Sequence, residues 1–445
     1  MRPDSLTEGN IRLTPHWSDV FHLRYLVPAA VGVVLAAVAA IRGESVREGL
    51  SVAAILLAIT LLLLLVVEKK RRSASVELSG EWLFYSFGRS RRKLRLNGEE
   101  RVEICRSPLL RLLGCVEMKV YSGVTKRAWL SVRLPEKAAK AAVRAMVPCG
   151  AVTGRILPGR HSAAVCALTS ERPVLLLIFS AYFTLFSGEN RMMNDVSVLL
   201  LASATCEFLR CFAKHRGLSL IRMENGCLVT AGTWKSREIY IPEKGIAGAW
   251  FRRSPAHVLC GFGCLSLITS GGTEIPVACR VRGDEGREAA LRLIGAQDRT
   301  CVELYQPDSL RKQYAALFAA TVFAAFVSTL LAFRHNDAGS RALLCTAAAF
   351  HTAAALRGLV GMRCAGGFGL RLSASAVFSG GMRGCTAWQS FIRREHIAGI
   401  RIRSGLFMRM NGMCTAQPYT RGGRKAPKCR CVSYESMNGL VSRFC

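Results

Sequence analysis

The sequence lacks the short motifs that mark the common classes of enzyme. It contains no G-x-x-x-x-G-K-[ST] phosphate-binding loop, no H-E-x-x-H zinc motif and no G-x-S-x-G nucleophile motif. Its eight histidines are scattered, and only His351 lies inside an apolar run. We therefore predict a protein that is not an enzyme, with no catalytic residues and no cofactor.

Metal-ligand spacing is missing too. The closest cysteine pairs are Cys260/Cys264 and Cys429/Cys431, and neither has the spacing of a paired zinc knuckle. His257 beside Cys260 does not complete a ligand set. The sequence therefore predicts no metal site.

Acidic residues are scarce: 30 Asp and Glu stand against 61 Lys and Arg, and the net charge is +31. Yet 51% of the residues are hydrophobic and the mean hydropathy is +0.25, which excludes intrinsic disorder. Charge and apolar residues must therefore be segregated along the chain. The length suggests about three domains of roughly 150 residues each.

The apolar residues form runs, several of them about as long as a membrane-spanning helix, which needs ~20 apolar residues. Four of the runs are strong and carry no charge. Two weaker runs lie between them: a short one, also without charge, and one that contains Glu207 and Arg210. In chain order the six runs are Tyr25–Ile41, Leu50–Val67, Pro173–Ser187, Val196–Ala213, Tyr314–Phe333 and Ala342–Leu356. Short connectors pair them, so we expect three transmembrane helical hairpins with six helices. A buried hairpin of a soluble domain is the alternative for the weaker pair.

One sequence unit occurs three times. Ser107–Gly114 (SPLLRLLG) is echoed by Ser254–Gly261 (SPAHVLCG) and, more loosely, by Ser404–Gly412, with the serines 147 and 150 residues apart. Ile-Ala-Gly at 246–248 recurs at 397–399. The apolar hairpins begin at a similar period. An internal triplication is the simplest explanation.

Between the hairpins the hydrophobic pattern has period two, which favours antiparallel strands separated by Gly and Ser-Gly turns. Each strand region is followed by a predicted helix, at Pro135–Met146, Asp284–Ile294 and Tyr434–Phe444. We therefore expect an α+β integral membrane protein. The expected segments are an N-terminal segment (1–24), three hairpins (25–67, 173–213, 314–362), three β domains (68–147, 214–299, 363–445) and two linkers (148–172, 300–313).

This organisation resembles the bacterial pleckstrin-homology-like membrane proteins of the YdbS/YdbT type. The resemblance rests on the strands, the S-P-L-x-R-L-x-G turn and the terminal helix after a two-helix hairpin. Its best residues are Ser107, Pro108, Leu109, Arg111, Leu112 and Gly114, then Ser254, Pro255 and Gly261. In the third copy Gly405 replaces the proline. The resemblance implies a PH-like, strongly bent seven-stranded sheet closed by a helix in each copy.

The charge is concentrated in the three β domains. They hold 19, 13 and 14 basic residues against 8, 8 and 2 acids, whereas the hairpin connectors are nearly neutral. By the positive-inside rule, both termini and all three PH-like domains should be cytoplasmic in a multi-pass cell-membrane protein. No cysteine lies in the predicted external connectors, which agrees with a reducing compartment for the thiols.

The basic clusters are the candidate lipid- or partner-binding residues. They are Lys69, Lys70, Arg71, Arg72, Arg89, Arg91, Arg92, Lys93, Arg252, Arg253, Arg401 and Arg403. Juxtamembrane basic residues attract anionic lipid at roughly 1 kcal/mol each, although these charges could also serve topology alone. We expect a non-enzymatic scaffold that binds anionic headgroups of the inner leaflet, a protein partner or another copy of itself, for example by strand addition. The alternative is a component of a transport or cell-envelope defence system. Nucleic acid is not an expected partner.

Overall fold

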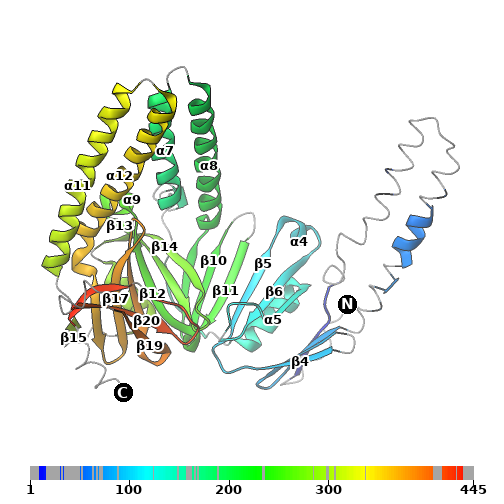
Figure 1. Ribbon diagram of the computed structural model, residues 1–445. Helices are drawn as coiled ribbons and strands as arrows, with labels where there is room; N and C mark the ends of the chain where they lie inside the picture. Colours follow the sequence, from blue (N-terminus) through cyan, green and yellow to red (C-terminus); the bar gives the residue numbers. More distant parts are fainter. Residues whose placement is uncertain are drawn as a thin grey trace. The chain divides into compact units, whose positions relative to one another are not determined.

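The computed structural model divides the chain into two compact units. Unit 1 comprises residues 1–122, 127–149 and 235–242, and unit 2 comprises residues 123–126, 150–234 and 243–445. The described residues are 10–16, 31, 34, 51, 54–62, 65, 66, 69, 74–87, 90–123, 125–147, 150–156, 163, 164, 167, 170–187, 190–232, 236–283, 285–296, 300–304, 307–335, 337–403, 413–426 and 428–433. Figure 1 gives the elements and their order.

Unit 1 contains two antiparallel strand sets. The first is a meander in the order β1-β2-β3-β4, and the second has the order β7-β6-β5-β11. Its strands are β1 (Asn10–Leu13), β2 (Ser75–Ser79), β3 (Trp82–Phe87), β4 (Ser90–Arg95), β5 (Arg101–Arg106), β6 (Cys115–Tyr121), β7 (Leu130–Pro135) and β11 (Ser236–Pro242). The period-two pattern puts Val76, Leu78 and Leu83 on one buried face of the meander.

Two helices complete unit 1. The Ser-Pro signature forms a short helix, α4 (Pro108–Leu112), whose N-cap Ser107 accepts a hydrogen bond from the backbone N–H of Leu110. The predicted terminal helix is confirmed as α5 (Glu136–Met146), which starts after Pro135. Its buried residues recur at helical spacing, so one stripe of α5 faces the core: Ala139, Ala142, Val143 and Met146.

Unit 2 contains three antiparallel strand sets. One set is β8 (Val152–Ile156), β9 (Ser219–Met223) and β10 (Gly226–Ala231). A second runs β14-β13-β12-β18-β17-β16-β15, and a third runs β19-β20-β21. The remaining bounds are β12 (Ile246–Arg253), β13 (Phe262–Thr269), β14 (Glu274–Arg282), β15 (Thr300–Leu304), β16 (Gly369–Ser373), β17 (Ala376–Arg383), β18 (Thr386–Arg393), β19 (Ile397–Arg403), β20 (Met413–Thr420) and β21 (Cys429–Ser433).

The second Ser-Pro copy forms α9 (Pro255–Leu259), again with its serine, Ser254, as N-cap. The second terminal helix is α10 (Gly286–Ile294), near its predicted place. Short 3-10 turns precede two strands: η2 (Glu243–Gly245) before β12 and η4 (Arg394–His396) before β19. A third, η3 (Ala365–Gly367), precedes β16. The third Ser-Gly turn (404–412) and the third predicted helix (434–444) lie outside the described residues.

Four long helices of unit 2 form two hairpins that stand together in Figure 1: α7 (Glu171–Ser187) with α8 (Arg191–His215), and α11 (Pro307–Arg334) with α12 (Ala338–Cys364). Small residues let the second pair approach closely. A Cβ on Gly358 would lie 2.8 Å from the Phe318 backbone nitrogen. In the first pair, Ser180 donates a hydrogen bond to the Ser197 carbonyl at 3.1 Å.

The expectation of six membrane-spanning helices is not met. Among the described residues, three helical segments are long and apolar enough to cross a membrane: Arg191–His215, Leu310–Arg334 and Gly339–Gly367. Helix α7 has only 17 residues and begins with Glu171 and Arg172. Its apolar part is therefore shorter than the ~20 residues that a membrane-spanning helix needs. Most of the first predicted hairpin (25–67) lies outside the described residues, although positions 54–62 are helical.

The structure adds a strand to the predicted unit. Strands β1, β8 and β15 each precede a hairpin segment in the chain and pair with the first strand after it, namely β2, β9 and β16. Two segments expected to be linkers (148–172 and 300–313) therefore contain strands. Five-residue strands in a polar context have too weak a periodicity to stand out in the sequence.

Candidate functional site

The meander of unit 1 has one buried face and one exposed face. The β3–β4 register pairs Trp82 with Arg95, Phe84 with Lys93, and Ser86 with Arg91. Residues paired across an antiparallel ladder share a face, so these six side chains lie on one side of the sheet. Leu83, which is 1% exposed, lies on the other side. We call Trp82, Phe84, Arg91, Lys93 and Arg95 the aromatic–basic face.

The aromatic residues of this face are unusually accessible for their size. Trp82 and Phe84 are 36% and 38% exposed, and their rings stack at a centroid distance of 6.4 Å. The Lys93 ammonium lies 5.4 Å from the Trp82 ring centroid, within reach of a cation–π attraction. Apolar rings and cations therefore alternate over one short stretch of surface.

The charge of the face is only partly neutralised. Arg95 is ion-paired with Glu81 at 3.2 Å, and on the neighbouring strands Arg12 is paired with Glu77 at 3.1 Å. Within the described part of the chain, no carboxylate is ion-paired with Arg91 or Lys93. Both side chains are exposed, so the face presents net positive charge to its surroundings.

The structure divides the predicted cluster at 89–93. Arg91 and Lys93 lie on the aromatic–basic face, whereas Arg92 is paired with Tyr85 and lies on the opposite side of the strand. Arg89 lies outside the described residues, as do Lys70, Arg71 and Arg72. Lys69 is helical and exposed.

The other predicted basic residues belong to unit 2. Arg401 and Arg403 are exposed on β19. Arg253 donates a hydrogen bond from Nε to the Phe262 carbonyl at 3.2 Å. Arg252 is paired with Glu274 at 3.3 Å and lies 5.1 Å from the Trp388 ring centroid. The twelve predicted residues therefore include both exposed charges and charges used inside the fold.

Arg252 is part of a packed arginine–tryptophan cluster. Glu274 also pairs with Arg424 at 2.8 Å, and the Arg424 guanidinium lies 4.3 Å from the Trp250 ring centroid. Trp250 and Trp388 meet edge to face at 5.1 Å. Burial lowers the pKa of Arg424 from its ordinary value. This cluster joins β12, β14 and β18 to the loop after β20, which gives Arg252 a structural role.

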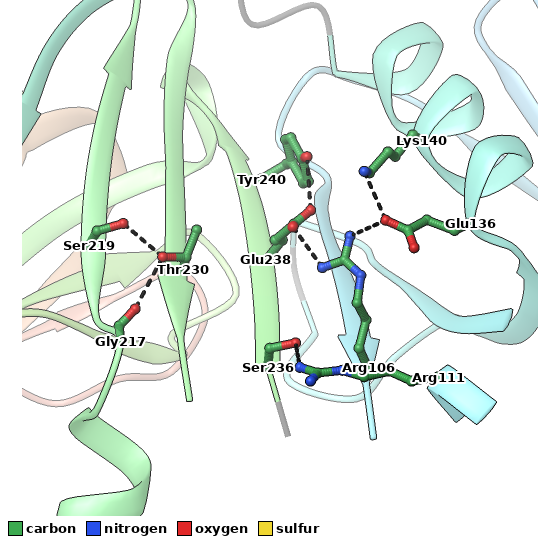
Figure 2. A network of polar contacts seen from close by, with 10 residues as sticks. All are labelled: Arg106, Arg111, Glu136, Lys140, Gly217, Ser219, Thr230, Ser236, Glu238 and Tyr240. Carbon is green, nitrogen blue, oxygen red and sulfur yellow. Dashed lines mark hydrogen bonds and ion pairs between the residues drawn. The ribbon is translucent and has the colours of Figure 1, made fainter. Parts of the chain in front are cut away.

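A second polar network, shown in Figure 2, holds β11 to β5 within unit 1. Arg106 is ion-paired with Glu238 at 2.6 Å and with Glu136 at 2.9 Å, and Lys140 reaches Glu136 at 2.8 Å. Figure 2 also shows Arg111 donating a hydrogen bond to Ser236 Oγ at 2.8 Å. Arg111, one of the residues on which the resemblance rests, thus contributes to the junction of β5 and β11.

His257, considered above as a partial metal ligand, is used inside the fold. Its ring Nδ1 lies 2.6 Å from Ser254 Oγ, and its Nε2 lies 3.3 Å from Cys264 Sγ. The same two residues form the capping box of α9: the His257 backbone N–H donates to Ser254 Oγ, and the Ser254 backbone N–H donates to His257 Nδ1, each at 3.3 Å. In the described part of the chain, no group of three His, Cys, Asp or Glu residues has the geometry to hold a metal ion.

Sequence reasoning missed Trp82 and Phe84 as surface residues. The segment WLFYSF was identified only as a strand, with no prediction of which of its side chains are exposed. A signal was available in the sequence: side chains alternate between the two faces of a strand, so Trp82 and Phe84 share a face. In the structure, the odd-numbered basic residues of the next strand lie on that face.

Comparison with known proteins gives no relative: no protein-family model, no curated protein and no solved structure matches this chain.

Proposed function

We propose that this protein is a non-enzymatic membrane scaffold whose aromatic–basic face binds the anionic headgroups of a lipid bilayer. The observation that carries the proposal is the presence, on one exposed face, of two accessible aromatic rings and of two cations that have no ion-paired carboxylate among the described residues. The described part of the same chain holds three helices that are long and apolar enough to cross a membrane, which supports a bilayer as the binding partner.

The physical chemistry of the interface supports this choice. Aromatic side chains prefer the headgroup level, where the ring is partly dehydrated. Each cation near an anionic leaflet contributes about 1 kcal/mol, so Arg91 and Lys93 together contribute about 2 kcal/mol. That is a weak attraction for a free domain, but it is sufficient to orient a domain already tethered to the bilayer by its own helices.

A PH-like nature of the three strand regions forms part of this proposal. The first and third regions each combine a four-stranded set with a three-stranded set. In the third region their buried residues pack together, as Leu370, Leu372 and Val377 do against Cys414 and Ala416. Such a sheet pair with a terminal helix agrees with the bent sheet that the resemblance implies.

Binding of a soluble short-chain phospholipid to the full-length protein in neutral detergent tests the proposal. We expect tighter binding of phosphatidylserine than of phosphatidylcholine, and a loss of that preference in the double variant Arg91→Gln, Lys93→Gln. The matched control is Lys137→Gln, Arg144→Gln, which removes the same charges from exposed positions on α5. Equal loss in both double variants would mean that net charge, and not this face, attracts the lipid.

A further inference from the structure

Two strand junctions in this protein have the same construction. In unit 1, β5 pairs antiparallel with β11, and in unit 2, β12 pairs antiparallel with β18. In both cases the strand that leads into a Ser-Pro signature pairs with the strand that directly precedes, in the chain, the 3-10 turn of the next repeat. The same kind of strand pairing is therefore used twice.

The two junctions also share one register. Arg106 is opposite Ser236, and Arg253 is opposite Ala387. Each arginine directly precedes the serine of the Ser-Pro signature, while Ser236 and Ala387 each lie seven residues before a 3-10 turn, η2 or η4. One interface is thus used twice, with equivalent residues facing each other.

Two strands that could pair in this way have no such partner among the described strands. Strand β4 is the last strand of the first four-stranded set, and β19 is the first strand of the last three-stranded set. Each lies at the end of its sheet, and among the described strands β4 pairs only with β3 and β19 only with β20. An unpaired edge of this kind is a template for a further strand.

We propose that β4 of one copy of this protein pairs antiparallel with β19 of a second copy, by the same interface that joins successive repeats within the chain. The occupant is a second copy because the strand that fits each open edge is present in this sequence. Two reciprocal contacts of this kind would close a two-fold dimer, and unreciprocated contacts would build a head-to-tail chain.

The second internal junction gives the register of the proposed contact, because Ile-Ala-Gly at the start of β12 recurs at the start of β19. Gly248 is the third residue of β12, and its partner Ile392 is the penultimate residue of β18. The equivalent residues are Gly399, third in β19, and Leu94, penultimate in β4. In an antiparallel ladder that starts from Gly399 opposite Leu94, Arg401 lies opposite Arg92.

The side chains set the strength of the contact. At the first internal junction, carboxylates face the arginines: Arg106 is paired with Glu238, and Arg237 lies 3.6 Å from Glu103. In the proposed contact Arg401 instead faces Arg92, and like charges directly opposite are destabilising. Association should therefore be weak at low ionic strength and should increase as salt screens the repulsion.

A charge-reversal cycle on the full-length protein tests this contact. Two differently tagged copies are co-expressed, purified in neutral detergent, and the fraction that co-purifies is measured against protein concentration. Arg92→Glu alone and Arg401→Glu alone each create a Glu–Arg pair, and we expect each to strengthen association roughly twofold to fivefold. The double variant creates a Glu–Glu pair and should return to the wild-type level.

This pattern distinguishes a specific contact from a general charge effect. Simple reduction of positive charge would make the double variant associate more strongly than either single variant, which would contradict the proposal. The matched control is Arg91→Glu, on the same strand but opposite Ile402 in the proposed register, and its effect should not depend on residue 401. The proposal would also be overturned if the two tagged copies did not co-purify at any salt concentration. Pairing of β4 with β19 within one copy would give that result.

The test is independent of the lipid-binding proposal. Arg92 lies on the opposite side of β4 from the aromatic–basic face, and strand pairing uses the backbone edge of β4. A protein that associates by this cycle and shows no lipid preference would support the contact and refute the proposed function.

Discussion

Arg106 and Glu238 are 132 residues apart in the chain, yet Arg106 Nη1 lies 2.6 Å from Glu238 Oε1. The Arg106 side chain is 13% exposed and also reaches Glu136, so one guanidinium ties β5, β11 and α5 together. The pKa of Arg106 is affected most by burial, which lowers it, but the hydrogen bonds and charges of Glu238 and Glu136 outweigh burial and raise it overall.

Replacement of Arg106 by alanine should therefore destabilise unit 1. It leaves Glu238 and Glu136 without their shared cation, and we expect a loss of about 2 kcal/mol, less than for a fully buried pair because both carboxylates keep some solvent. Urea-induced unfolding of the full-length protein in detergent measures the change. The control is Arg95→Ala, whose partner Glu81 is 68% exposed, and it should cost less than about 1 kcal/mol. Equal losses in the two variants would refute the role given to Arg106.

The same network predicts a dependence of stability on acid. The hydrogen bond from Lys140, followed by that from Arg106, holds the pKa of Glu136 below its ordinary value of 4.5. A carboxyl with a lowered pKa stabilises the folded state above 4.5, and this contribution disappears as the pH falls through the folded-state pKa. Glu136 is nearly half exposed, so the effect is modest. We expect the free energy of unfolding, measured from neutral to acidic pH, to fall less steeply below pH 4.5 for Glu136→Gln than for the wild type. The same slope in both proteins would contradict this role of Glu136.

Close packing of α11 against α12 predicts a steric effect at Gly358. A valine there would press on the Phe318 backbone, and overpacking of this kind typically costs 1–3 kcal/mol. The control is Gly366→Ala, since a Cβ at Gly366 would meet no atom within 4 Å. We expect a lower thermal unfolding temperature in detergent for Gly358→Val only. A normal unfolding temperature for that variant would mean that the two helices do not pack in this way in the purified protein.

The sequence allowed a good prediction of local structure and a poor one of strand partners. The spacing of Ser107 and Ser254 located two equivalent segments, which were expected to be turns. The structure shows them to be the short helices α4 and α9, each with its serine as N-cap and a proline after it. The period-two pattern of Trp82–Gly88 and Cys264–Thr269 correctly indicated strands, which are β3 and β13. It could not indicate that β11 pairs with β5, because the alternation of a strand specifies which face is buried and not which distant strand lies beside it.

The candidate site was predicted in part for a similar reason. The charge run at 89–93 was expected at a hairpin tip between two strands, but residues 90–95 form strand β4 itself. A run of cations carries no information on which side chains share a face. Only the register showed that Arg91 and Lys93 accompany Trp82 and Phe84 while Arg92 does not. Among the arginines of unit 2, composition could not separate Arg252, which pairs with Glu274, from the exposed Arg401.

The central claim is that the aromatic–basic face contacts an anionic bilayer. Amide hydrogen exchange of the segment 82–95 measures this most directly in the full-length protein, reconstituted in nanodiscs of pure phosphatidylcholine or of a mixture with phosphatidylserine. We predict slower exchange of this segment in the anionic nanodiscs, reversed by high salt and absent in the variant Arg91→Gln, Lys93→Gln. Identical exchange of the wild-type segment in the two kinds of nanodisc would contradict the account.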